Sequence, residues 1–328
     1  LFMLRFSTIF ALLATLHCFN NIVLDSMSRR KPNLRPVTVY SEAERGCFSP
    51  GASARILILP IKGTILNSTE QNVRDRVSPS QVAAVLEAAA RDKSIKTVLL
   101  QIDSPGGAVG ASDLIYELIR KAQEKHTYKV YAHIEDLGAS GGYYAAMAAD
   151  HINARPTALV GSIGVIMRGF ELTGLLDKSG IKYRTIQTGK NKDTLSPFRE
   201  MTPEEKAYYQ KEVEHSYDRF LQIVKNGRKD RISMENLRNI ADGRVMNASR
   251  AREAGLIDST VYLEDYIKQI KEREKMSSVE VVAYLPAEFS NYSLYDVQTG
   301  PAEQLPQILR ETLRSQFGLF YIWEPFLN

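Results

Sequence analysis

A single serine, Ser140, stands in the glycine- and alanine-rich stretch GASGGYYAAMAAD, which begins at Gly138. A serine surrounded by such small residues indicates either a flexible turn or a nucleophile held where a strand turns into a helix. A serine nucleophile also needs a base that takes its proton. The first question is therefore which residue types elsewhere in the chain offer that base.

Neither the histidines nor the lysines identify the base on their own. His133 and His151 fall on expected strands near the serine turn, but each is more typical of a core or surface histidine. A lysine can act as base when burial lowers its pKa by several units. The stretch TGKNKDTLSPFREMTPEE offers Lys190 and Lys192, which share one side of the chain if the segment is extended. A solvated charged loop has the same Lys-x-Lys pattern, so the residues leave the base open.

Two glycine-rich loops each follow an expected strand and open an expected helix. DSPGG follows the apolar run over 95–102, and GASGG follows the run over 128–134. In a parallel sheet the carboxyl ends of strands share one edge, so the two loops can meet there. Their backbone amides suit a developing oxyanion or a phosphate. The sequence has neither G-K-[ST] nor G-x-G-x-x-G at these glycines, which excludes a Walker loop and a dinucleotide fingerprint.

Strand and helix signals alternate through the middle of the chain. Ser78 followed by Pro79 and then Gln81 predicts a helix start with a capping box. Strands are expected around Ile152, Ile163 and Tyr183, and a long charged amphipathic helix over 203–228. This alternation predicts an α/β fold of βαβ units with a mostly parallel sheet.

Composition narrows the class of protein. The chain has 328 residues, 44% of them hydrophobic, and a formal net charge of +4. No dense basic tract with interleaved aromatic residues occurs, so nucleic acid is not an expected partner. Two cysteines, Cys18 and Cys47, are too few for a disulfide framework or a structural zinc site, and they fit either redox compartment. No metal or cofactor is expected.

The N-terminal segment predicts contact with a membrane. The apolar stretch over 4–24 has its dense centre at 8–16, and His17, Asn20 and Asn21 interrupt it, so it falls between a signal-peptide core of about 7–15 residues and a bilayer span of roughly 20. We expect an uncleaved hydrophobic anchor over 1–28, with a cleaved signal as the alternative, and a linker over 29–54. Arg29, Arg30 and Lys31 outnumber Arg5, so the positive-inside rule alone would place the body in the cytoplasm.

Five motifs together carry a family resemblance: DSPGG, GASGGYYAA, GSIGV, GKNKDTLSPFREMT and ADGRVMNASRAREAGLID. In this order and spacing they resemble the bacterial signal peptide peptidase A (protease IV) family of Ser–Lys peptidases, over roughly 56–275. The resemblance implies a Clp-protease/crotonase fold of stacked ββα units. It implies Ser140 as nucleophile and Lys192 as general base, with Ser162 hydrogen-bonded to the lysine. The amides of Gly107 and Gly141 would form the oxyanion hole.

The same resemblance implies a membrane-associated serine endopeptidase without a cofactor, which cleaves apolar peptides such as signal-peptide remnants. Its catalytic domain would lie on the outer, periplasmic face of the cytoplasmic membrane. Copies of the chain would form a ring with active sites shared between protomers. Two alternatives stay open: a crotonase-type acyl-CoA hydratase or hydrolase, and a catalytically inactive membrane scaffold.

The domain plan places the peptidase domain at 55–275 and a C-terminal extension at 276–328. The extension carries an expected amphipathic helix near 305–316 and the aromatic end FGLFYIWEPF. An apolar end on a peptidase with an apolar groove is either a ligand for that groove or a contact between protomers. A tail helix packed on its own domain is the third interpretation.

Overall fold

A computed structural model describes residues 34–42, 54–67, 76–286 and 293–295, together with the backbone of 318–322. The expected anchor over 1–28 and the helix expected near 305–316 lie outside these residues. None of the helices in the described ranges combines the length and apolarity that a membrane span requires.

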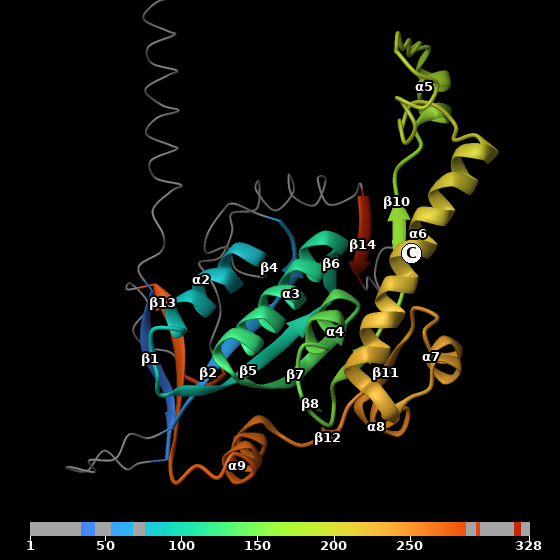
Figure 1. The fold of residues 1–328 in the computed structure, drawn as a ribbon. Coiled ribbons are helices and arrows are strands. Elements are labelled where there is room, and N and C mark those ends of the chain that lie inside the picture. The colour runs from blue at the N-terminus through green and yellow to red at the C-terminus, as the bar shows by residue number, and fades with distance from the viewer. Residues whose placement is uncertain (1–33, 43–53, 68–75, 287–292, 296–317, 323–328) are drawn as a thin grey trace, which may run out of the picture.

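A nine-stranded, mostly parallel sheet forms the centre of the fold (Figure 1). Its main path runs β1-β13-β2-β5-β7-β8-β12. These strands span Leu34–Ser41 (β1), Val279–Pro286 (β13), Ala54–Lys62 (β2), Ile95–Ser104 (β5), Lys129–Ala139 (β7), His151–Ala154 (β8) and Ser259–Thr260 (β12). Strand β9 (Leu159–Gly161) pairs with β7 and with β11 (Val245–Asn247). The predicted α/β class with a mostly parallel sheet is confirmed.

The central strands are buried on both faces because their side chains alternate between two cores. Leu57 and Leu59 of β2 belong to the larger core, which packs against α2 (Pro79–Ala89), α3 (Val109–His126) and α4 (Gly141–Ala146). Ile56 and Ile58 belong to the smaller core, which packs against α9 (Leu263–Arg273). Figure 1 shows α2, α3 and α4 on one side of the sheet and α9 on the other.

The helices predicted to begin near residues 79 and 203 are both present. The Ser78 backbone N–H donates to Gln81 Oε1 (2.8 Å), and the Gln81 N–H donates to Ser78 Oγ (3.4 Å), which completes the capping box of α2. The expected helix over 203–228 is α6 (Pro203–Arg228), and Thr202 and Glu205 form its capping box. Reciprocal caps of this kind satisfy backbone donors that a helix start otherwise leaves free.

The structure corrects three expectations about the chain's organisation. Residues 34–41, expected in a linker, form β1, whose sequence LRPVTVYS alternates polar and apolar side chains and pairs with β13. The sheet therefore extends beyond 55–275 on both sides. Tyr183 lies in no strand; its ring packs against Phe198 with centroids 5.0 Å apart, so an aromatic contact explains the apolar signal there. Ile163 follows β9 as a buried loop residue.

A second sheet lies at the edge that carries the glycine loops, with the order β10-β14-β6-β3-β4. Its short strands span Ile166–Arg168 (β10), Gly318–Ile322 (β14), Gly106–Ala108 (β6), Thr64–Ile65 (β3) and Arg76–Val77 (β4). This sheet joins strands that are far apart in the sequence, from β3 at residue 64 to β14 at residue 318.

Residues 169–214 form an arm that extends away from the two sheets (Figure 1). The arm contains α5 (Thr173–Ser179) and the first half of α6, and Glu205 is its only buried residue. By contrast, the second half of α6 buries Phe220, Leu221 and Val224 in the larger core. Nearby lie η1 (Lys229–Arg231), α7 (Met234–Ile240) and α8 (Ala248–Glu253). The arm therefore has almost no hydrophobic core of its own.

Candidate active site

Ser140 occupies a sharp turn between β7 and α4, as the sequence predicts. Its backbone has φ 51° and ψ −115°, a conformation that costs a non-glycine residue free energy. Its N–H donates to the carbonyl oxygen of Gly161 (2.7 Å), and its carbonyl oxygen accepts from the Tyr144 N–H (2.8 Å). The side chain is 1% exposed, and Oγ has no hydrogen-bond partner among the described residues. The backbone of Ser140 is thus held by its neighbours, whereas its buried hydroxyl is bound to none of the described residues.

The two glycine loops meet at one edge, and Ser104 joins them. Ser104 ends β5 and pairs in register with Gly138 of β7. Its Oγ donates to the carbonyl oxygen of Gly63 (2.6 Å) and accepts from the Gly106 N–H (3.1 Å). A Cβ at Gly142 would lie 2.9 Å from the Ser104 carbonyl oxygen, so this close approach requires glycine. Ser104 has no sequence signal for this position, because its contacts join segments that are distant along the chain.

Gly107 lies on β6, next to β3. A Cβ at this position would lie only 1.9 Å from the carbonyl oxygen of Ile65. β6 runs parallel to β3, with Ile65 opposite Gly107. Gly141, the other glycine expected at the oxyanion hole, is the first residue of α4 and is buried beside Ser140.

Ser162 lies next to the Ser140 turn. It follows β9, whose Gly161 is opposite Ala139 of β7. Ser162 is 5% exposed, has φ 50°, and donates its N–H to the carbonyl oxygen of Arg244 (2.8 Å). The turns at Ser140 and Ser162 are therefore held side by side by neighbouring parallel strands.

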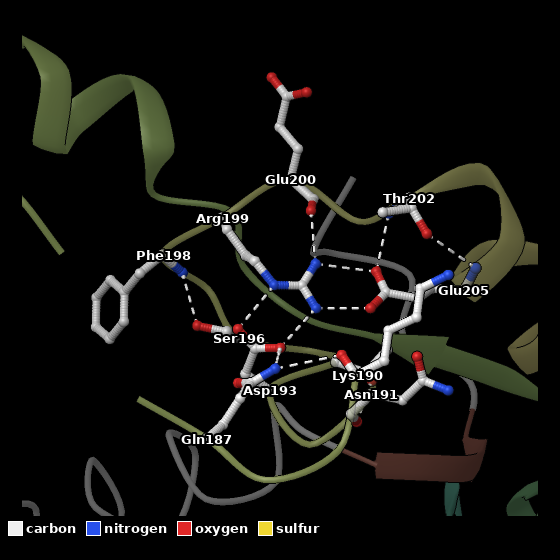
Figure 2. Close-up of polar contacts among 11 residues, drawn as sticks. Gln187, Lys190, Asn191, Asp193, Ser196, Phe198, Arg199, Glu200, Thr202 and Glu205 are labelled. Atoms are coloured by element: carbon white, nitrogen blue, oxygen red, sulfur yellow. Dashed lines mark hydrogen bonds and ion pairs between the residues drawn. The ribbon is translucent and has the colours of Figure 1, made fainter. Parts of the chain in front are cut away.

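Lys192 is on the arm, whereas Ser140 lies in the body of the fold. Lys192 is exposed, and among the described residues no hydrogen bond joins it to Ser140 or Ser162. The structure therefore brings Ser140, Ser162, Gly107 and Gly141 to one edge of the sheet, and it does not bring Lys192 to them within one chain. The loop that carries Lys192 is held by Arg199 (Figure 2), another residue that no sequence signal marks.

The two histidines near the serine turn are core residues, as their sequence context suggested. His133 is fully buried, its Nδ1 lies 2.6 Å from Asn153 Nδ2, and burial lowers its pKa to about 3. His151 Nδ1 lies 2.8 Å from the Tyr266 hydroxyl, and burial lowers its pKa to about 4. Both contact the face covered by α9, where Tyr266 lies. Neither is hydrogen-bonded to Ser140.

The C-terminal strand β14 lies between β6 and β10 (Figure 1). It runs antiparallel to both, with Tyr321 opposite Gly107 and Phe320 opposite Ala108 and Ile166. A segment of the chain's own end therefore pairs with the strand that carries one of the expected oxyanion glycines. In the described ranges, no group of three or more His, Cys, Asp and Glu side chains is placed to hold a metal ion.

Comparison with known proteins agrees with the five motifs. The sequence model of Peptidase family S49 matches residues 122–277, and that of the Clp protease family matches 62–160. A candidate signal peptide peptidase SppA of Enterococcus faecium is 34% identical over 247 residues, which cover 74% of this chain and 71% of that protein. The chain belongs to peptidase family S49. As a member of this serine peptidase family it has a Clp-protease-like fold.

Two further relatives show the breadth of the similarity. A candidate protease of Synechocystis is 36% identical over 213 residues, which cover 64% of this chain and 71% of that protein. The chloroplastic serine protease SPPA of Arabidopsis thaliana is 33% identical over 221 residues, which cover 67% of this chain and 32% of the plant protein. These matches favour a peptidase fold and family over the acyl-CoA enzyme.

The contact between Gly107 and Ile65 generates a stability prediction. Gly107→Ala is expected to destabilise the fold by about 1–3 kcal/mol, because its methyl group has no room beside a backbone carbonyl. Gly110→Ala is the matched control: it lies in α3, where a Cβ meets no atom within 4 Å, and alanine favours a helix by up to about 1 kcal/mol over glycine. Urea unfolding of both variants measures the difference. Equal midpoints would contradict the described approach of β3 to β6.

Proposed function

We propose that the chain is a membrane-associated serine endopeptidase in which Ser140 is the nucleophile and Lys192 of a neighbouring copy is the general base. The observation that carries this proposal is the buried Ser140 Oγ, held without a hydrogen-bond partner at a strained strand-to-helix turn beside Gly107 and Gly141. Oγ attacks the peptide carbonyl carbon while Lys192 Nζ takes the hydroxyl proton. Lys192 returns that proton to the leaving amine, and water then hydrolyses the acyl-enzyme by the same steps.

The site needs a second copy because the base and the nucleophile are on separate parts of one chain. The arm carries Lys192 and exposes much apolar surface. It holds nine of the thirteen exposed large hydrophobic side chains among the described residues: Phe170, Leu175, Ile181, Tyr183, Ile186, Leu195, Phe198, Met201 and Tyr208. Exposed apolar surface of this kind marks a protein interface. Head-to-tail contacts between arm and body would close a ring with the same composite site at every interface.

The oxyanion of the tetrahedral intermediate is assigned to the amides of Gly107 and Gly141. Fixed backbone N–H groups stabilise developing charge without reorganising during the reaction. Ser104 contacts the loops of both glycines, so it holds the two donors at a constant separation. The hydrogen bond to the incoming lysine is assigned to Ser162, which lies beside the Ser140 turn.

The peptide substrate is proposed to bind as an extended strand between β6 and β10, where β14 lies in this structure. Strand addition supplies backbone hydrogen bonds that any sequence can make, and neighbouring pockets select side chains. A cavity of about 520 Å³ adjoins β10, and its apolar lining includes Met167, Phe170, Leu195 and Met201. This lining supports apolar peptides, such as signal-peptide remnants, as substrates. The proposed location of the catalytic domain is the outer face of the cytoplasmic membrane, where it would act on such remnants.

Lysine substitutions test the assignment of the base. With an apolar peptide substrate, Lys192→Arg should be as inactive as Lys192→Ala and Ser140→Ala, because a guanidinium group does not give up its proton in a protein. Lys190→Ala is the matched control two residues away and should keep most activity. The wild-type kcat/KM should rise into the alkaline range, since the base must be uncharged. A limb near pH 6.5, or an inactive Lys190→Ala beside an active Lys192→Ala, would reassign the base.

Removal of the C-terminal strand tests the substrate slot. A chain that ends at Gly300 lacks β14, so Ser140 should react faster with a serine-directed phosphonate and KM for an apolar peptide should fall. A chain that ends at Ile322 keeps β14 and serves as the control, with kinetics like those of the full chain. Identical labelling rates for all three chains would show that β14 does not compete with substrate.

A further inference from the structure

The loop that carries Lys192 is organised around one guanidinium group, that of Arg199 (Figure 2). Arg199 donates to both carboxylate oxygens of Asp193, from Nε to Oδ2 (3.0 Å) and from Nη2 to Oδ1 (2.9 Å). It donates to both oxygens of Glu205, from Nη1 to Oε2 (2.9 Å) and from Nη2 to Oε1 (2.6 Å). Its remaining donor reaches the carbonyl oxygen of Glu200 (3.0 Å). All five N–H groups of Arg199 are therefore used.

These bonds tie the lysine loop to the start of α6. Gln187 Nε2 donates to Asp193 Oδ1 (3.0 Å) and to the carbonyl oxygen of Lys190 (3.2 Å), on either side of Lys192. At the other end, Glu205 accepts from the Thr202 N–H (2.9 Å) in the α6 capping box. Because Glu205 is the only buried residue of the arm, polar bonds rather than a hydrophobic core determine the shape of this loop.

The same bonds control the charge beside Lys192. Asp193 is the next residue along the chain, and hydrogen bonds from Arg199 lower its pKa to about 2. They lower the pKa of Glu205 to about 2 as well. Both carboxylates are thus ionised at neutral pH, and the groups that face Asp193 are Arg199 and Gln187. A carboxylate without its counter-ion favours a protonated neighbour, which is the wrong state for a lysine base.

We propose that Arg199 is a positioning residue for the reaction: it holds the loop that presents Lys192 and compensates the negative charge of Asp193 beside it. This role rests on the proposed function, because it matters only if Lys192 is the base. Arg199 does not touch the reacting atoms. It acts through the shape of the loop and through the field at the lysine amine.

The test compares pH profiles of kcat/KM on an apolar peptide for full-length variants. Arg199→Met should lower kcat/KM at neutral pH by at least tenfold and move its acid limb upward by about one pH unit, as expected for an unmasked neighbouring carboxylate. Arg199→Met combined with Asp193→Asn removes that carboxylate, so the limb should return toward the wild-type pH while activity stays low. Arg238→Met, which breaks an exposed pair with Asp218, is the matched control and should change neither quantity.

The outcomes separate this role from the proposed function. Loss of activity in Arg199→Met with an unmoved limb, or a limb that the double variant does not restore, would overturn the electrostatic role. A wild-type profile without an alkaline limb would overturn the proposed function itself, and the role of Arg199 with it. Thermal unfolding should show the same Tm for Arg199→Met as for the wild type, because Arg199 lies on the arm outside both cores.

Discussion

The turn at Ser140 is the constraint on which the rest of the site depends. Its left-handed backbone costs roughly 1–3 kcal/mol and persists only where the surroundings fix it. Those surroundings are the bond to Gly161 and the six residues of α4, all of which are buried. Tyr143 donates its hydroxyl to the carbonyl oxygen of Leu256 (2.7 Å), and Tyr144 donates to Asp113 (2.5 Å). Gly142 is required in α4 because Ser104 approaches it so closely that a Cβ would lie 2.9 Å from the Ser104 carbonyl oxygen.

In the proposed function, the division between body and arm keeps the nucleophile apart from its base until copies of the chain assemble. The body positions Ser140 and the two glycine amides with tightly packed strands, where small displacements are costly. The arm holds its lysine by a charge network, with exposed apolar side chains on either side of it. In the proposed function, a single chain is inactive because it lacks a base at its serine. Assembly then brings the base and the serine together.

Local signals predicted several of the elements that build the site, whereas the pairings between distant segments could not be predicted from them. The capping box that begins at Ser78 marks a helix start within four residues of sequence, and the Ser140 turn follows from a strand, a glycine turn and a helix in succession. The pairing of β14 with β6 joins residues more than 200 positions apart, so no local pattern encodes it. The role of Lys192 came from resemblance alone, because a Lys-x-Lys pattern looks the same in a solvated loop.

The central claim, that serine and lysine come from different chains, is tested most directly by mixing two inactive variants. Ser140→Ala and Lys192→Ala chains are co-expressed in equal amounts, and peptidase activity of the co-assembled complexes is measured. An interface works only when an intact serine faces an intact lysine, a chance of one half times one half, so about a quarter of wild-type activity should return. Co-assembled complexes with no recovered activity would place both residues in one chain and contradict the account.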